Sequence, residues 1–206
     1  MDSITTFFGF MDPIEVIAAL FGFICVVLTL RQNIWCWPTG LVQVTLYIWV
    51  FYKARLYSDM GLHAVYVAMS VFGWWNWLHG GMDRGKLMVQ RLTAAGTILW
   101  LGTAVAGTAG LGAAMSAWTD ASLPYWDAAT TVLSLIAQWL MAKKVLESWL
   151  YWITVDVLAV GIYAVKGLYP SSLLYAAFLV LASMGFLAWY RSWRDDAVMQ
   201  AVPERA

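Results

Sequence analysis

The stretch TAAGTILWLGTAVAGTAGLGAAMS, from Thr93 to Ser116, contains no charged side chain. A helix that crosses a bilayer needs about 20 mostly apolar residues, so this stretch predicts a transmembrane helix. Six further apolar stretches flank it, three before it and three after it. The predicted spans are Ile14–Leu30, Pro38–Ala54, Met60–Leu78, Thr93–Ser116, Pro124–Ala142, Trp149–Val165 and Pro170–Tyr190.

The composition is that of a membrane protein. Hydrophobic residues make up 62% of the 206 residues, charged residues make up 12%, and the mean hydropathy is +0.70. Because a soluble domain usually carries about 25% charged residues, a water-covered globular domain is excluded. The formal net charge of zero argues against nucleic-acid binding. Two cysteines, Cys25 and Cys36, are too few for a disulfide framework or a zinc site, and the absence of Lys and Arg before Arg31 predicts no cleavable signal peptide.

Lysine and arginine in the loops predict the orientation, because these residues accumulate on the cytoplasmic side of a membrane protein. With seven spans, one side receives nine of them and the other side three. We therefore expect the N-terminus outside and the C-terminus in the cytoplasm. The larger set is Arg31, Arg84, Lys86, Arg91, Lys143, Lys144, Arg191, Arg194 and Arg205, and the smaller set is Lys53, Arg55 and Lys166.

The chain also resembles itself when it is shifted by 112 residues. Span boundaries then coincide, and identical residues meet. These pairs are Ile24 with Ile136, Trp37 with Trp149, Leu46 with Leu158, Leu56–Tyr57 with Leu168–Tyr169, Leu62 with Leu174, Ala64 with Ala176, Gly73 with Gly185 and Trp77 with Trp189. The shift predicts two parallel three-helix repeats joined by one linker helix. Transporters built from such repeats bind substrate near the midplane, between the halves.

The expected organisation of the chain has five parts. They are an extracytoplasmic tail over 1–13, a first repeat over 14–78, a linker helix over 93–116, a second repeat over 124–190 and a cytoplasmic tail over 191–206. In the linker helix, Gly102, Ala106 and Gly110 have small-xxx-small spacing. This face predicts close packing against a repeat or against a neighbouring subunit.

Polar residues within the spans are the candidates for a binding site, because a buried polar group needs a partner. Thr131, Ser134 and Gln138 share one helix face, and Trp149, Trp152 and Asp156 share another. Each has a structural alternative: hydroxyls bond their own helix, amides such as Gln43 and Gln138 join helices, and Asp156 is as consistent with a structural hydrogen bond as with a ligand contact. The remaining candidates are Gln43, Tyr47 and Asn76. The repeat does not duplicate these groups, which favours an asymmetric ligand.

Four motifs resemble the PnuC family of vitamin transporters: WPTGLVQVTLY (Trp37–Tyr47), LYSDM (Leu56–Met60), GWWNW (Gly73–Trp77) and DAATTVLSLIAQWLMAKKVLESWLYW (Asp127–Trp152). The resemblance covers roughly Leu30 to Trp193. It implies a 3+1+3 fold like that of the SWEET transporters, a homotrimer, and a place in the bacterial cytoplasmic (inner) membrane. It also implies import of nicotinamide riboside by facilitated diffusion, driven by a cytosolic riboside kinase. The substrate-binding residues that it implies are Gln138, Trp149, Trp152, Asn76, Gln43, Tyr47, Thr131, Ser134 and Asp156.

Other functions remain open or are excluded on particular residues. The same fold with thiamine or another nucleoside-like vitamin as substrate is the nearest alternative, and a receptor or scaffold without transport activity is a second. A retinal protein needs a lysine in its last span, and Pro170–Tyr190 has none. The two histidines, His63 and His79, form no HExxH motif, so we expect no enzyme, no catalytic residue, no metal and no cofactor.

Overall fold

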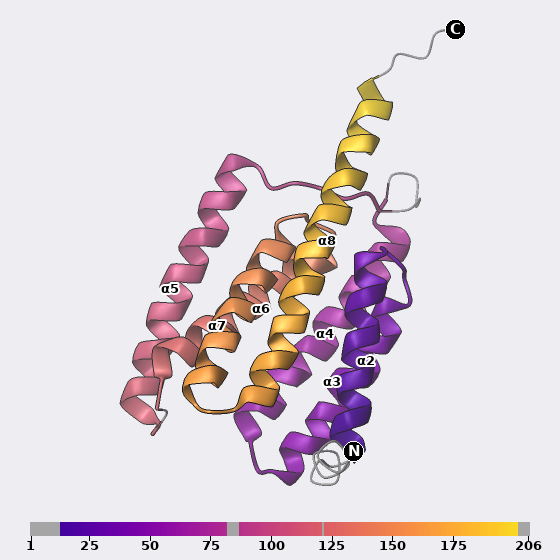
Figure 1. The fold of residues 1–206 in the computed structure, drawn as a ribbon. Helices are drawn as coiled ribbons and strands as arrows, with labels where there is room; N and C mark the ends of the chain where they lie inside the picture. Colours follow the sequence, from indigo (N-terminus) through magenta and orange to yellow (C-terminus); the bar gives the residue numbers. More distant parts are fainter. Residues whose placement is uncertain (1–12, 82–86, 121, 202–206) are drawn as a thin grey trace, which may run out of the picture. The chain divides into compact units, whose positions relative to one another are not determined.

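The computed structural model describes residues 13–81, 87–120 and 122–201, which form seven α-helices (Figure 1). The predicted all-α fold with seven helices is confirmed. The helices are α2 (Pro13–Leu30), α3 (Cys36–Lys53), α4 (Tyr57–His79), α5 (Ala94–Trp118), α6 (Pro124–Ala142), α7 (Ser148–Val165) and α8 (Tyr169–Ala201). The predicted N-terminal tail up to residue 12, residues 202–206 of the predicted C-terminal tail, and the predicted cytoplasmic cations Arg84, Lys86 and Arg205 lie outside the described residues.

Four of these helices are long and apolar enough to cross a membrane: Pro13–Leu30, Ala94–Trp118, Ser148–Val165 and Tyr169–Met199. The other three, α3, α4 and α6, carry the amide side chains of the candidate site, which lower their hydropathy. Gln43 lies in α3, Asn76 in α4 and Gln138 in α6. Polar groups inside a bundle are tolerated when they face protein or a water-filled path rather than lipid.

Helix α8 is longer than its predicted span. It was expected to end at Tyr190, but it continues to Ala201, beyond the ends of α6 and α7 (Figure 1). The reason is local, because no proline or glycine follows Tyr190 within the helix to end it. The added turns carry Arg191, Arg194 and Asp195, which suit the aqueous side of the membrane.

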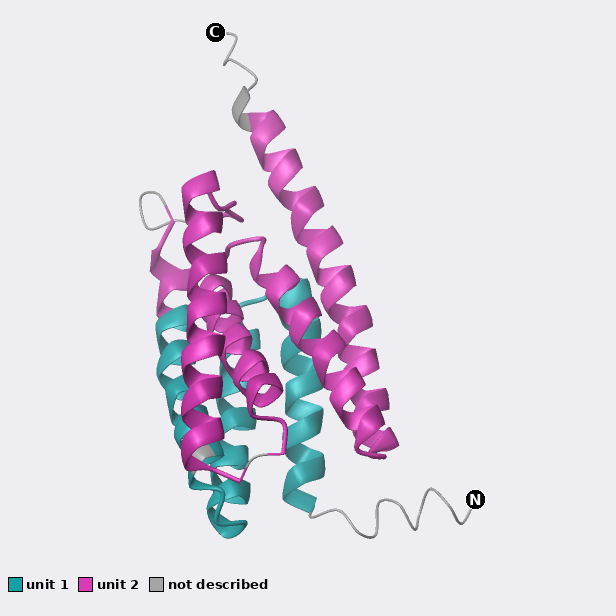
Figure 2. Cartoon of the chain, turned by 90° about the vertical axis from the view of Figure 1, so that its left-hand side faces the viewer, with its two compact units in different colours: residues 1–74 teal, residues 75–206 magenta. Residues whose placement is uncertain are grey.

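The chain divides into two compact units, Met1–Trp74 and Trp75–Ala206 (Figure 2). In the first unit α2 packs on α3. In the second unit the helices pack in chain order, α5 on α6, α6 on α7 and α7 on α8. The end of α4, which includes Asn76 and Trp77, belongs to the second unit.

The two units contain the same turns at an offset of 112 residues. Among the described residues, four have positive φ: Gln32 (53°) pairs with Lys144 (56°), and Arg55 (59°) pairs with Gly167 (71°). The hydrogen bonds around each pair also match. Asn33 N donates to Leu28 O at 2.9 Å, and Val145 N donates to Leu140 O at 3.0 Å. Helices α2, α3, α6 and α7 thus each end in a Schellman-type turn with a left-handed residue. The similarity at an offset of 112 residues therefore includes the backbone conformation of these turns.

Arg55 and Gly167 allow a reciprocal test of these turns. A non-glycine residue in the left-handed region costs roughly 1–2 kcal/mol, and both positions are exposed. Arg55→Gly is expected to stabilise the protein by about 1 kcal/mol, and Gly167→Ala to destabilise it by a similar amount. A Cβ at Gly167 would meet nothing within 4 Å, so only the backbone conformation is tested. Thermal unfolding in detergent measures both; shifts of the same sign would contradict the matched conformations.

Each unit also packs a tryptophan against a glycine at the same offset. The ring of Trp37 occupies the space beside Gly73, and a Cβ built on Gly185 would lie 2.6 Å from Cη2 of Trp149. Both indoles are buried, with 4% of Trp37 and 2% of Trp149 exposed. Only glycine lets the ring approach this closely, which explains why both glycines and both tryptophans appear in the repeat.

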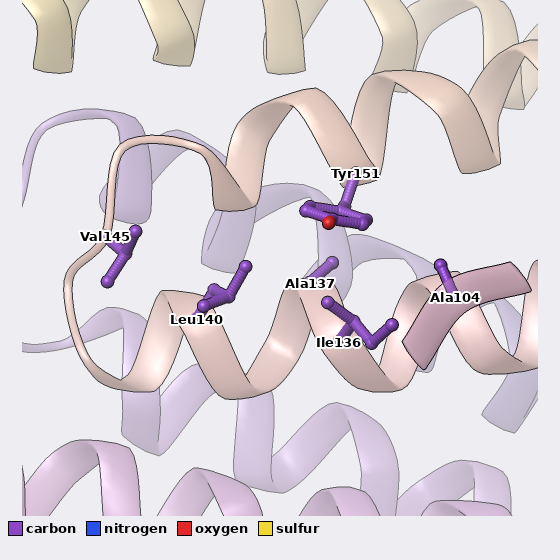
Figure 3. Packing of buried hydrophobic residues seen from close by; sticks show 6 residues of the cluster. All are labelled: Ala104, Ile136, Ala137, Leu140, Val145 and Tyr151. Atoms are coloured by element: carbon purple, nitrogen blue, oxygen red, sulfur yellow. The ribbon is translucent and has the colours of Figure 1, made fainter. Parts of the chain in front are cut away.

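Helix α5, which the sequence predicts to be a linker helix, contributes to a core cluster of the second unit with α6 and α7 (Figure 3). Within the chain, its close contacts do not use the predicted face with Gly102, Ala106 and Gly110, so of the two predicted roles of that face only the contact with a neighbouring subunit stays a prediction. Gly107 contacts Val132 of α6 and Gly112 contacts Tyr125, whereas a Cβ on Gly102 or Gly110 would meet nothing within 4 Å. Close packing of α5 within the chain therefore uses a neighbouring face. The cluster consists of Ala104, Ile136, Ala137, Leu140, Val145 and Tyr151.

Candidate functional site

The predicted polar stripe on α6 has mixed roles. Ser134 is buried, and its Oγ donates to the carbonyl oxygen of Thr131 at 3.0 Å. This is the helix-bonding alternative that the sequence left open, so Ser134 has its donor engaged in the absence of a ligand. Thr131 and Gln138 lie on the same face and are partly buried, which leaves both accessible enough to contact a ligand.

The stripe on α7 carries a buried acidic side chain. Asp156 is only 5% exposed, and its carboxylate has no hydrogen bond or ion pair with any residue that the structure describes. A buried carboxylate without a partner is expensive, which favours a functional role. Trp152, one turn earlier on the same face, is partly buried and packs against the core cluster.

Trp149 lies in a tryptophan cluster rather than open to a ligand. Its ring meets the ring of Trp189 edge-on, with centroids 5.6 Å apart, and Trp189 in turn lies 5.7 Å from Trp77. Its Nε1 is buried and has no hydrogen-bond partner among the described residues. Gly185 lies against one part of the ring. Trp149 is therefore better placed to donate a hydrogen bond than to stack.

Asn76 is tied to the end of α6. Its Nδ2 donates to Ala142 O at 2.9 Å, and the neighbouring Trp77 Nε1 donates to Met141 O at 3.1 Å. The last carbonyls of a helix have no partner within the helix, so both side chains complete the hydrogen bonding of α6. This contact orients Asn76 whether or not it also reaches a ligand.

In the first unit, Gln43 and Tyr47 lie on α3 in different surroundings. The Gln43 amide packs against Gly22 of α2, where a Cβ would lie 2.7 Å from Nε2. Tyr47 belongs to a ring cluster, with its centroid 5.8 Å from Phe51 and 5.6 Å from His63. Gln43 thus occupies the helix interface that the sequence allowed as its structural alternative, and Tyr47 is held by aromatic packing.

Two residues that the sequence did not mark as functional, Lys144 and Glu147, make long-range contacts with the segment before α5. Lys144 was counted only as a loop charge, yet it is 2% exposed, and its Nζ donates to Leu87 O at 2.7 Å. Glu147 was not singled out, although its carboxylate accepts from Arg91 Nε and from Leu92 N, both at 3.0 Å. These partners are more than fifty residues away in the chain, so no local pattern points to them.

The fold and these residues define an integral membrane protein of the transporter type, with a duplicated scaffold and polar groups that are not duplicated. A family model described as Nicotinamide mononucleotide transporter matches residues 12–191. The chain belongs to this family, which confirms the resemblance seen in the sequence. The family consists of transporters, so the protein is a transporter and not an enzyme.

Individual relatives cover most of the chain. The nicotinamide riboside transporter PnuC of Escherichia coli (strain K12) is 27% identical, over 88% of this chain and 87% of that protein. The riboflavin/roseoflavin transporter RibM of Streptomyces davaonensis is 27% identical over 92% of this chain and 91% of its own length. A crystal structure of the vitamin B3 transporter PnuC superimposes with a TM-score of 0.74 and 26% identity, covering 94% of this chain and 87% of that one.

Proposed function

We propose that this protein imports nicotinamide riboside across the bacterial cytoplasmic membrane. The observation that carries the proposal is the match to nicotinamide riboside transporters over nearly the whole chain, including 84% of it against the PnuC of Neisseria mucosa. The solved structure with the same fold is that of a vitamin B3 transporter. The unpartnered carboxylate of Asp156 adds support, because the pyridinium ring of nicotinamide riboside carries a fixed positive charge.

The proposed site assigns a separate task to each group of residues. Trp152 stacks on the pyridinium ring, which a π face attracts, and Asp156 lies opposite its charge. Trp149 donates its Nε1–H, which is buried and has no partner among the described residues, to a ligand oxygen in the conformation that opens the site. Gln138 and Thr131 replace water around the ribose hydroxyls. Asn76 and Ser134 hold the second unit's part of the site through the contacts described above. Gln43 and Tyr47, in the first unit, are assigned to substrate binding on the family resemblance alone.

The proposed mechanism is alternating access without a coupling ion. The repeats expose a midplane site to one side and then to the other. A ligand shifts a conformational equilibrium only by its differential affinity for the two states, so an uncoupled carrier equilibrates its substrate and cannot concentrate it. A cytosolic kinase then supplies the driving force, because the phosphorylated riboside is no longer a substrate for return.

We propose the orientation and assembly on separate grounds. The excess of Lys and Arg in the predicted cytoplasmic loops supports a cytoplasmic C-terminus. The family resemblance supports a homotrimer, and the face of α5 with Gly102 and Gly110 is open for a contact between subunits. Light scattering of the purified protein in detergent gives the number of chains per particle, and a monomer would contradict the assembly.

A different vitamin is the second candidate, and one observation favours it. RibM, described as a riboflavin/roseoflavin transporter, covers 92% of this chain at the same identity as the riboside transporter of Escherichia coli. Stacking on Trp152 and hydrogen bonds from amides suit the flat ring and hydroxylated part of either ligand, or of thiamine. A charged carboxylate at Asp156 favours a cationic ring over the neutral flavin.

Calorimetry of the purified protein in detergent distinguishes these candidates. The panel consists of nicotinamide riboside, its phosphorylated mononucleotide, nicotinamide, thiamine and riboflavin. We expect binding of the riboside and no binding of the mononucleotide, since the added phosphate would lie at the ribose end, where Gln138 and Thr131 offer it no positive charge. Preference for thiamine or riboflavin would keep the fold but change the substrate. Binding of none would favour a receptor or scaffold with another ligand.

A further inference from the structure

An extended segment, Leu87–Leu92, lies against the turn between α6 and α7; we call it the strap. Its residues alternate, with Leu87 and Val89 buried and Met88 and Gln90 exposed, as in a strand with one covered face. Gln90 N donates to Lys144 O at 3.0 Å, and Leu146 N donates to Gln90 O at 2.8 Å. Gln90 and Val145 thus form a parallel β-bridge.

Side chains fasten the strap at both of its ends. At one end Lys144, almost fully buried, donates to Leu87 O and lies 4.7 Å from the ring centroid of Trp77. At the other end Glu147 accepts from Arg91 Nε and Leu92 N. The side chain of Glu147 is 12% exposed, and a charge-assisted bond is stronger in such surroundings than on an open surface.

The strap covers the turn between α6 and α7, and this turn is buried. Residues 144–149 are all buried, whereas connecting turns almost always run over the surface of a protein. The turn at the equivalent place in the first unit, residues 32–37, is more open, and its Trp35 is 64% exposed. The strap therefore adds to the second repeat something that the first repeat lacks.

The strap also joins the linker helix to this turn. Leu92 is followed by Thr93, the N-cap of α5, whose side chain accepts from Gly96 N. The Leu92 side chain packs against the core cluster, which includes Val145 (Figure 3). The start of α5, the end of α6 and the first turn of α7 are thus connected by backbone bonds, an ion pair and apolar packing.

We infer that the strap is a permanent tie that makes α5, α6 and the first turn of α7 a single body during transport. Parting it would break the backbone bridge and expose Leu87, Val89 and the Lys144 ammonium together. The turn at the opposite end of α7, at Lys166, Gly167 and Leu168, is exposed. Near it, α7 and α8 are joined by a hydrogen bond from Ser172 Oγ to Val160 O at 3.1 Å and by stacking of Tyr163 on Tyr175. The strap is therefore expected to stay closed while other parts of the second unit move, and Glu147 is a positioning residue.

A reversible disulfide tests this inference. Paired strands lie about 4.8 Å apart, within the range of roughly 4.4–6.8 Å that a disulfide spans between Cα atoms, so Gln90→Cys with Val145→Cys is suitable. The background replaces Cys25 and Cys36 with alanine. Riboside uptake into proteoliposomes is compared before and after oxidation of the same sample, with each single-cysteine variant as control.

A permanent tie predicts that oxidation changes the uptake rate by less than about twofold. A loss of more than about tenfold that reduction reverses would show that the strap parts in each cycle, and it would overturn the inference. The inference rests on the proposed function, but the reduced sample tests that function separately.

Glu147→Gln gives a second readout that does not depend on cysteine. The amide still accepts from Leu92 N but loses the charge that holds Arg91. We expect the Gln90 and Leu146 amides to exchange with deuterium about tenfold faster. Asp195→Asn is the matched control, since its pair with Arg194 is exposed on both sides, and it should leave those amides unchanged. Equal exchange in both variants would contradict the role of Glu147.

Discussion

Trp152→Ala is expected to weaken nicotinamide riboside binding by roughly 30- to 100-fold, which corresponds to about 2–3 kcal/mol. Stacking of an aromatic ring contributes about 1–3 kcal/mol, and the pyridinium charge adds a cation–π term of about 0.5–2 kcal/mol. Trp152 is the indole of the pair that is left partly exposed, because Trp149 is enclosed by Trp189 and Gly185. Calorimetry on the purified variant measures the change.

The control for this prediction is a tryptophan at the surface. Trp118 ends α5 and is 84% exposed, so Trp118→Ala removes the same side chain without touching the proposed site. It should bind the riboside with unchanged affinity. If Trp152→Ala folds and binds as tightly as the unaltered protein, the stacking role of Trp152 is wrong.

Asp156→Asn is expected to raise stability and to lower affinity for the riboside together. Removing a buried charge that has no partner relieves its desolvation, so the ligand-free variant should melt at a higher temperature. The same change removes the attraction for the cationic ring, and we expect about tenfold weaker binding, about 1.4 kcal/mol. A higher melting temperature together with weaker binding indicates a functional carboxylate, whereas loss of a structural carboxylate would lower the melting temperature.

A neutral analogue sharpens the test of Asp156. The dihydronicotinamide riboside has the same sugar and amide but no ring charge, so Asp156→Asn should leave its affinity almost unchanged. Equal losses for the charged and neutral ligands would place Asp156 near the sugar instead. No loss for either ligand would remove it from the site.

The helices and the repeat could be predicted from the sequence because both are encoded locally. Long apolar runs between charged turns specify each helix. The repeat matches Trp37 with Trp149 and Gly73 with Gly185, and in each unit the tryptophan packs on the glycine. The left-handed turns were not predictable in the same way, since only Gly167 of the four residues is a glycine. The length of α8 was missed because hydropathy marks where a span ends and not where a helix ends.

The candidate site was predictable in its residues but not in their roles. Periodicity places Trp149, Trp152 and Asp156 on one face of α7, yet it cannot show that Trp149 is enclosed and that Asp156 lacks a partner. The contact of Asn76 with Ala142 and that of Glu147 with Arg91 join segments that are distant in the chain. Such pairs arise only when the helices have packed.

Uptake of labelled nicotinamide riboside into proteoliposomes tests the central claim most directly. Without a kinase, facilitated diffusion predicts that the internal concentration of riboside rises to the external one and stops, with or without a proton gradient. With a riboside kinase and ATP enclosed, the label should continue to accumulate as the mononucleotide. Accumulation above the external concentration without kinase, or uptake no faster than in protein-free liposomes, would contradict facilitated diffusion of the riboside.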